Sequence, residues 1–206
     1  DRYSLCVLGA EAVAGLSWQG LKTLASGFYN DAYLFDQNAC SSPRLVIWLG
    51  SGEEVKKAQD LFWEAVGGQV RQRYELQPVN AVDKYAQLLE ISLDCPWVKR
   101  VLRHGNWIYR LEITEIPSDL EQVAGKFGTF LEYAAESVDT VAKAVTERFQ
   151  TLVYFGVEKD DLRGFVLRNR LTGIDRVVPI GAALDIGVIW DGYDLIRTLS
   201  RVINFK

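Results

Sequence analysis

One cysteine lies in a polar loop in the first quarter of the chain, where its thiol could act as a nucleophile. Cys40 stands within Phe35-Asp-Gln-Asn-Ala-Cys-Ser-Ser-Pro-Arg44, among Asn38, Ser41 and Ser42 rather than in an apolar run. A thiolate is the strongest nucleophile among the ordinary side chains. The opposing interpretation is that an isolated cysteine is a small buried hydrophobe. The loop position of Cys40 makes it a candidate nucleophile, and the local pattern alone leaves both interpretations open.

Other chemistry-bearing residues have structural explanations. His104 is the only histidine, so a multi-histidine metal site or a histidine-dependent hydrolase is hard to build. We expect no metal, and we expect His104-Gly-Asn to form a hairpin turn. Cys6 lies in an apolar run, and Cys95 precedes Pro96 at a helix end, so both cysteines are expected to be structural.

A Gly50-Ser-Gly52 segment imitates the start of a dinucleotide-binding fingerprint. The third glycine of such a motif is missing, because Val55 occupies its place. Glu53 and Glu54 would also repel a phosphate at the following helix N-terminus, whereas they suit the helix dipole. We therefore interpret these glycines as structural.

Composition excludes several classes of protein. A formal net charge of −4 and the lack of a basic stripe argue against a nucleic-acid partner. The apolar runs are far shorter than a membrane span, and no secretory signal opens the chain. Three widely spaced cysteines fit free thiols in a reducing compartment, so the cytoplasm is the expected location.

Short apolar strands alternate with helices along the sequence. This order predicts one α/β domain over residues 1–206, with a mainly parallel sheet covered by helices on both faces. The loop of Cys40 is then expected at a carboxyl end or switch point of that sheet. The predicted strands are 4–8, 44–49, 128–133, 152–157 and 176–180, the predicted hairpin is 98–102 with 107–113, and the predicted helices are 17–35, 51–65, 80–92, 137–149 and 160–170.

Two of these helices are predicted from apolar spacing, which also predicts their buried faces. For residues 80–92 the expected buried side chains are Val82, Tyr85, Leu88 and Leu89, and for residues 137–149 they are Val138, Val141, Ala142, Val145 and Phe149.

Two segments resemble the bacterial acyl-CoA (fatty-acid) reductases of the LuxC type, which belong to the aldehyde dehydrogenase superfamily. Gln37-Asn-Ala-Cys-Ser-Ser-Pro43 resembles the nucleophile loop of that family. Gly173-Ile-Asp-Arg-Val-Val-Pro-Ile-Gly181, with Ile189-Trp-Asp-Gly-Tyr-Asp-Leu195, resembles its C-terminal signature. Gly125-Lys-Phe-Gly-Thr129 is similar to a superfamily segment that packs near the nicotinamide.

The resemblance implies the fold of an aldehyde dehydrogenase catalytic domain and a mechanism through Cys40. The thiolate would attack a fatty acyl-CoA or acyl-protein thioester, and the acyl-enzyme would accept hydride from NADPH to give a fatty aldehyde. The backbone N–H of Cys40 would stabilise the oxyanion, assisted by Asn38 or by the Ser41 and Ser42 hydroxyls. Phe127 and Gly128 would be cofactor contacts.

The resemblance also sets expectations about what surrounds this chain. Superfamily members carry an N-terminal cofactor-binding domain that nothing here matches, so most of the NADPH site is expected outside these residues. The glutamate that contacts the nicotinamide ribose in the superfamily would fall near Gly125, where this chain has no carboxylate. The implied partners are a second copy, paired through an edge strand near Val202 to Phe205, and an acyl-protein synthetase as in luminescent systems.

Two further functions remain open on the sequence alone. A cysteine acyltransferase or thioesterase would share Cys40 but would need a base, for which His104 is the only histidine. A non-enzymatic α/β interaction domain would instead use exposed Trp and Tyr side chains as a partner surface.

Overall fold

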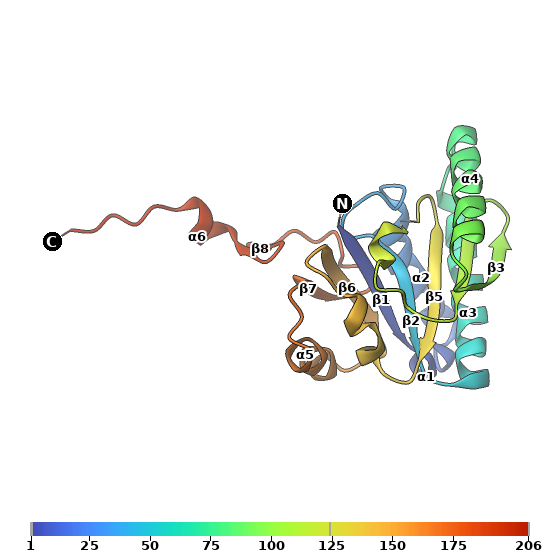
Figure 1. Ribbon diagram of the computed structural model, residues 1–206, viewed down its shortest axis with the longest axis horizontal. Coiled ribbons are helices and arrows are strands. Elements are labelled where there is room, and N and C mark those ends of the chain that lie inside the picture. Colours follow the sequence, from blue (N-terminus) through green and yellow to red (C-terminus); the bar gives the residue numbers. More distant parts are fainter. Residues whose placement is uncertain (1, 124, 206) are drawn as a thin grey trace.

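Seven strands build the central sheet of the computed structural model, which describes residues 2–123 and 125–205 (Figure 1). In chain order the elements are β1 (Tyr3–Gly9), α1 (Ala10–Ala14), α2 (Trp18–Tyr33), β2 (Pro43–Leu49), α3 (Gly52–Arg73), α4 (Pro78–Asp94), β3 (Val98–His104), β4 (Ile108–Ile113), η1 (Leu120–Gln122), β5 (Thr129–Ala135), η2 (Val138–Ala144), β6 (Phe149–Phe155), α5 (Lys159–Arg168), β7 (Arg176–Pro179), β8 (Ile189–Trp190), β9 (Tyr193–Asp194) and α6 (Leu195–Leu199).

The order of strands across the sheet is β3-β4-β5-β2-β1-β6-β7. All neighbouring pairs are parallel except β3 with β4, which form the antiparallel hairpin predicted around His104-Gly-Asn. Because the central strands are buried on both faces, they are continuous apolar runs, which made them recognisable in the sequence. The predicted mainly parallel α/β sheet is confirmed.

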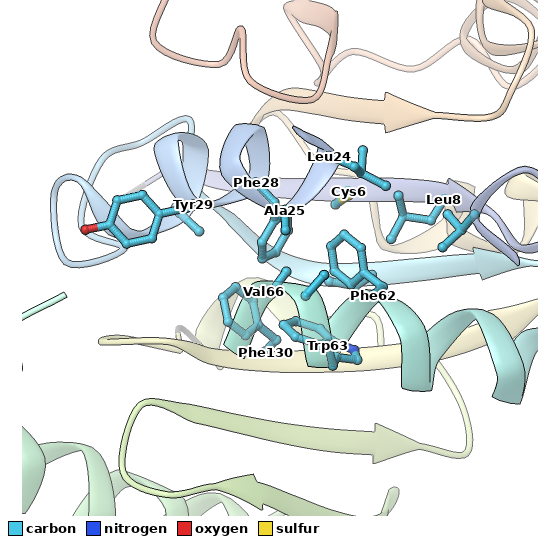
Figure 2. Close-up of a cluster of buried hydrophobic side chains, with 14 of the residues drawn as sticks. Cys6, Leu8, Leu24, Ala25, Phe28, Tyr29, Phe62, Trp63, Val66 and Phe130 are labelled. Atoms are coloured by element: carbon cyan, nitrogen blue, oxygen red, sulfur yellow. The ribbon is translucent and has the colours of Figure 1, made fainter. Parts of the chain in front are cut away.

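Helices cover both faces of this sheet. In β1 the side chains alternate, so that Cys6 and Leu8 enter one core while Leu5 and Val7 enter the other. The first core packs the sheet against α1, α2 and α3, with Phe28, Phe62 and other side chains between them (Figure 2). The second core lies under α4, η1, η2 and α5.

The segment predicted as a helix over 137–149 is a shorter 3₁₀ helix, η2, and Phe149 already belongs to β6. Its buried residues are Val138, Val141 and Ala144, which repeat every three positions. That spacing matches the three residues per turn of a 3₁₀ helix, and an apolar stripe alone does not separate it from the α-helical period.

The predicted buried face of α4 is also wrong in part. Leu88 is buried as expected, but its buried neighbours are Lys84 and Ile91. Val82, Tyr85 and Leu89 are exposed, as are Val79 and Leu93. The helix thus buries a lysine and leaves an apolar stripe uncovered in this chain.

The C-terminal residues 186–205, here called the C-terminal arm, contact the body at Trp190 and Asp191 and then extend away from it (Figure 1). The arm contains the small β8–β9 hairpin and α6. The edge strand expected near Val202 to Phe205 is absent from the described residues: residues 200–205 form no helix or strand. An extended segment becomes a strand only when a partner strand takes its hydrogen bonds, and no described segment lies beside it to do so.

None of the helices in the two described ranges is both long enough and apolar enough to cross a membrane.

Candidate active site

The loop that carries Cys40 connects α2 to β2. A loop that leads from a helix into a parallel strand lies at the amino end of that strand, so Cys40 lies at the amino edge of the sheet. The expectation of a carboxyl end or switch point is therefore wrong. Cys40 is exposed, whereas Cys6 is fully buried, and all three cysteines are free thiols.

Gln37 fixes this loop to the turn that precedes β5. Its side chain is fully buried, and its Oε1 accepts hydrogen bonds from the backbone N–H groups of Gly128 and Thr129, each at 3.0 Å. Its Nε2 donates to the carbonyl oxygens of Pro43 at 3.0 Å and Thr129 at 2.9 Å. Both side-chain polar groups of Gln37 are thus used to hold the two loops together.

Three residues with side chains adopt left-handed backbone conformations where these loops meet. Asp36 has φ 54°, Gln37 has φ 62° and Phe127 has φ 53°. The backbone N–H of Phe127 donates to the carbonyl of Asp36 at 3.2 Å. Such conformations each cost about 1–3 kcal/mol and persist where surrounding contacts enforce them, often at functional sites.

The peptide groups around Cys40 are individually oriented. The Ser4 hydroxyl donates to the carbonyl oxygen of Cys40 at 2.7 Å, and the Ser42 hydroxyl donates to the carbonyl oxygen of Asp31 at 2.8 Å. Within the described residues the backbone N–H of Cys40 donates to no other group. That N–H is therefore available to a developing negative charge beside the thiol.

A pocket of about 510 Å³ opens beside the thiol, and its lining is mostly apolar. The lining residues are Leu34, Phe35, Asp36, Asn38, Ala39, Cys40, Ser41, Leu184 and Trp190. It includes no Lys or Arg. Such a site suits an uncharged, elongated apolar group better than a phosphate.

Trp190 is held against this pocket by groups of the body. The Arg176 guanidinium lies over its ring, 4.3 Å from the centroid. Arg176 also donates to the carbonyl oxygens of Ala183 and Asp185, which shapes the turn before the arm. Asp191, next in sequence to Trp190, accepts a hydrogen bond from Gln150 on β6.

Asp31 joins α2 to the segment that brings Leu184 to the pocket. Its carboxylate accepts hydrogen bonds from the backbone N–H groups of Gly181 at 2.6 Å and Ala183 at 3.0 Å. Burial raises the pKa of Asp31 from 3.8 to about 6, against the opposing effect of these two hydrogen bonds. The pocket wall thus depends on a buried carboxyl group.

Arg44 is a buried cation near the Cys40 thiol. Arg44 donates through Nη1 to the carbonyl of Arg2 at 2.9 Å and is close enough to Cys40 for the two side chains to interact electrostatically. Burial lowers the pKa of Arg44, and the charge interactions with Tyr3 and, to a smaller extent, Cys40 oppose that effect.

The structure brings some predicted site residues together and separates others. Asn38 and Cys40 line the same pocket. Phe127 and Gly128 reach the Cys40 loop through Asp36 and Gln37, as described above. His104 lies at the end of β3 and lines a different cavity, with Trp63 and Arg110, that shares no lining residue with the Cys40 pocket.

Phe127 and Gly128 have little free capacity for a dinucleotide. Phe127 is 8% exposed, and its carbonyl oxygen accepts a hydrogen bond from the Lys84 side chain. The N–H of Gly128 donates to Gln37, and its carbonyl accepts from Tyr109. At this turn the chain offers a cofactor an apolar contact at the edge of Phe127, and no free backbone donor at Gly128 for a phosphate.

The Gly50-Ser-Gly52 segment lies at the opposite, carboxyl edge of the sheet. The crevice there is lined by Glu11, Glu54, Glu136, Glu158 and Asp161 and has no basic lining residue. The structural interpretation of these glycines fits this acidic surrounding. In the described ranges no three His, Cys, Asp or Glu side chains are grouped so that they could hold a metal ion.

Sequence reasoning did not identify Ser4, Asp31 or Gln37 as part of the site. Ser4 and Asp31 lie in elements recognised by their apolar neighbours, so nothing local distinguishes them. Gln37 lies in the segment that resembles the family's nucleophile loop, which was the available signal for it.

Comparison with known proteins agrees with this architecture. A family model described as acyl-CoA reductase (LuxC) matches residues 1–202. None of the curated proteins compared with the chain matches it.

Solved structures of aldehyde dehydrogenases have the same fold at low sequence identity. Proline utilization A from Bradyrhizobium japonicum is 15% identical, with a TM-score of 0.58, over 93% of this chain and 20% of its own. A putative methylmalonate-semialdehyde dehydrogenase from Sinorhizobium meliloti is 12% identical, with a TM-score of 0.53, over 87% of this chain and 39% of its own. A 1-pyrroline-5-carboxylate dehydrogenase from Thermus thermophilus is 12% identical, with a TM-score of 0.50, over 86% of this chain and 35% of its own.

Proposed function

Because the chain belongs to the acyl-CoA reductase (LuxC) family, we propose that it performs the acyl-transfer step of a fatty acyl-CoA reductase, with Cys40 as the nucleophile. The observation that supports this most directly is an exposed, free thiol at the mouth of an apolar pocket, on a loop held by buried hydrogen bonds. The chain spans only 20–39% of the structures described above, so the activity of a whole protein is part of the proposal.

The proposed step exchanges one thioester for another. The Cys40 thiolate attacks the carbonyl carbon of a fatty acyl-CoA or acyl-protein thioester, and a carbon–sulfur bond to Sγ forms. The bond to the departing thiol breaks, and that thiolate takes up a proton from water. The fatty chain lies along the apolar lining of Leu34, Phe35, Leu184 and Trp190.

Negative charge that develops on the carbonyl oxygen is stabilised by the backbone N–H of Cys40, which has no other acceptor within the described residues. The Asn38 side chain, exposed on the same pocket wall, is the proposed second donor.

When bound, NADPH would supply the hydride that reduces the acyl-cysteine to a fatty aldehyde. This chain contributes an apolar contact at Phe127, and groups that hold the phosphates lie outside the Cys40 pocket, which has no basic lining residue. Cys40 leaves as a thiolate, so the same residue starts and ends the cycle.

The position of His104 argues against the thioesterase alternative. A thioesterase needs a base that activates water beside the acyl-enzyme. His104 lines a cavity separate from the Cys40 pocket, and burial lowers its pKa. The pocket beside Cys40 contains no histidine, and the one carboxylate in its lining, Asp36, already accepts a hydrogen bond from the Tyr74 hydroxyl at 2.7 Å. Slow hydrolysis of the acyl-enzyme suits a reductase.

We also propose that the C-terminal arm pairs with a second copy of the chain. Its large apolar side chains are exposed, with Leu199 at 81%, Val202 at 96% and Phe205 at 89%. Sedimentation of the chain against a variant that ends at Asp185 tests this point. A homo-oligomer that becomes monomeric on truncation is expected, and equal mass for the two would contradict it.

Acyl transfer is tested by intact-mass analysis after incubation with tetradecanoyl-CoA. The unmodified chain is expected to gain one tetradecanoyl group and Cys40→Ala none. Cys95→Ala, which removes the other partly accessible cysteine, is the matched control and should be acylated normally. A thioesterase would return the adduct to the free thiol within the time course, whereas a reductase domain keeps it until a reductant is added.

A further inference from the structure

Lys84 is a fully buried lysine on α4. It faces the protein interior together with Leu88 and Ile91, at positions where an amphipathic helix ordinarily has apolar side chains. The ion pairs of the described residues do not include it. A buried cation without a carboxylate partner is costly, so its surroundings must compensate in another way.

Four backbone carbonyls surround the ammonium group. Nζ donates to the carbonyl oxygens of Asn106 and Trp107, each at 3.0 Å, in the turn between β3 and β4. It also donates to those of Phe127 at 2.6 Å and Gly128 at 3.2 Å, in the turn before β5. An ammonium has three N–H donors, so one donor is shared between two acceptors.

The turn between β3 and β4 and the turn before β5 are in close contact beside the ammonium group. A Cβ atom at Gly128 would lie 2.3 Å from the carbonyl oxygen of Trp107, so only glycine fits there. Phe127 has φ 53° and Gly128 has φ 83°. The oxygen ends of four carbonyl dipoles converge on Nζ, and this arrangement favours a positive charge between them.

The second of these turns is the one that holds the Cys40 loop. Its Phe127 N–H donates to Asp36, and its Gly128 and Thr129 N–H groups donate to Gln37. Lys84 therefore contacts the carbonyl side of the peptide groups whose N–H side anchors the Cys40 loop.

We propose that Lys84 is a positioning residue that fixes the turn at Phe127 and Gly128 and, through Gln37, the loop that carries Cys40. This inference rests on the proposed function only in that Cys40 is the reacting group. Lys84 has no contact with the Cys40 pocket and acts through the turn alone.

Aromatic and charged neighbours define the surroundings of the ammonium. Its Nζ lies 4.2 Å from the ring centroid of Tyr109, a cation–π contact from β4. The Tyr33 hydroxyl, from α2, shares the Trp107 carbonyl as acceptor at 3.3 Å. Burial, together with the charge of Arg103 on β3, lowers the pKa of Lys84 to about 7. The four carbonyls and the Tyr109 ring favour the charged form.

Three variants test the proposal. Lys84→Met keeps the length of the side chain and removes its charge and donors, and Lys84→Arg keeps the charge. Lys126→Met is the matched control, because Lys126 joins the same turn to Asp83 of the same helix through an exposed pair at 3.3 Å. Such pairs contribute little.

Two readouts separate positioning from a general loss of structure. Amide hydrogen exchange at Gly128 and Thr129 reports on their hydrogen bonds to Gln37, and exchange at Val46 in β2 reports on the distant sheet. The rate of acyl transfer from tetradecanoyl-CoA is compared with the rate of Cys40 alkylation by iodoacetamide, a small reagent that needs no oriented carbonyl.

Lys84→Met is expected to raise exchange at Gly128 and Thr129 at least tenfold and to slow acylation at least tenfold. Exchange at Val46 and the rate of alkylation should change less than threefold, Lys84→Arg should recover part of the loss, and Lys126→Met should match the unmodified chain. Unchanged exchange at Gly128 and Thr129 would overturn the proposal.

If Lys84→Met does not fold, Lys84→Arg decides. Its bulkier guanidinium keeps the charge but should not contact all four carbonyls at once, so exchange at Gly128 and Thr129 should rise at least threefold with Val46 unchanged. Equal exchange at all three amides in Lys84→Arg and the unmodified chain would overturn the proposal. If the unmodified chain is not acylated, the proposed function fails, while the exchange data still decide the role of Lys84.

Discussion

The hydroxyl of Ser4 donates a hydrogen bond to the carbonyl oxygen of Cys40 at 2.7 Å. The hydroxyl oxygen of Ser4 in turn accepts a hydrogen bond from the backbone N–H of Thr151 at 3.1 Å. A side chain at the start of β1 thus bridges β6 and the peptide group that follows the reactive thiol. Ser4 thus orients the Cys40 peptide group relative to β1 and β6. Gln37 separately ties the same loop to the turn before β5.

Replacement of Ser4 by Ala should therefore affect stability and acyl transfer together. It leaves the Thr151 N–H buried without a partner, which costs about 1–3 kcal/mol of unfolding free energy. Acylation by tetradecanoyl-CoA should slow while iodoacetamide alkylation does not. Urea unfolding measures the loss of stability, and mass spectrometry of samples quenched at successive times measures the rates of acylation and alkylation. Equal slowing of acylation and alkylation would contradict an orienting role for Ser4.

Asp31 predicts a pH dependence of stability. Its pKa is about 6 in the folded chain and 3.8 in the reference state, so the folded chain binds more protons between these values. The free energy of unfolding contributed by this group therefore falls as pH rises from about 4 to about 6 and is level above that.

Urea unfolding at several pH values measures this contribution as the difference between the unmodified chain and Asp31→Asn. The variant loses one of the two acceptors for Gly181 and Ala183, so it should be less stable throughout, and by the widest margin at pH 4. A difference that grows toward pH 6 would contradict the assignment.

Trp190 should control the preference for long acyl chains. Trp190→Ala removes an indole wall from the pocket, a loss of about 1–2 kcal/mol of apolar contact for a long chain. The ratio of acylation rates for tetradecanoyl-CoA over acetyl-CoA should fall about tenfold. Trp18→Ala, on an exposed tryptophan of α2 outside the pocket, should leave the ratio unchanged.

The buried ion pair between Arg110 and Glu132 is expected to stabilise the fold independently of Cys40. The Glu132 carboxylate accepts from Arg110 at 2.7 Å and from the indole N–H groups of Trp48 at 2.8 Å and Trp63 at 2.6 Å. Glu132→Gln leaves the buried Arg110 charge unpaired and should lower the free energy of unfolding by about 3–5 kcal/mol.

The matched control for that variant is Glu112→Gln. Glu112 pairs with Arg100, whose side chain is 55% exposed, so its loss should cost less than about 1 kcal/mol. Similar losses from the two variants would show that the Glu132 cluster is not held by charge.

The sequence was sufficient where local pattern and tertiary environment agree. The continuous apolar runs of β1 and β2 predicted buried parallel strands, and the polar residues around Cys40 predicted an exposed loop. Cys6, inside such a run, is buried as expected. In β1 the apolar side chains meet the buried environment that their polarity suggests, whereas in the Cys40 loop the polar residues Gln37, Ser41 and Ser42 are buried as well.

The rest depended on contacts between distant segments. Lys84 is buried because turns that begin 22 and 43 residues farther along the chain supply carbonyl oxygens, which no helical pattern on α4 predicts. The spacing of Val138, Val141 and Ala144 fits a 3₁₀ helix as well as an α-helix. The structure decides between them, because Phe149 belongs to strand β6 and not to the helix. Val202 and Phe205 have strand-like residues but no described neighbour with which to pair.

The most direct test of the central claim is to locate the acyl group and count the thiol released. Trypsin separates the three cysteines, and the peptide from Thr23 to Arg44 contains only Cys40. After incubation with tetradecanoyl-CoA, we predict one free CoA thiol released per chain and a tetradecanoyl mass on that peptide alone. Release of CoA with no adduct on this peptide, or an adduct on the Cys6 or Cys95 peptide instead, would contradict Cys40 as the acyl carrier.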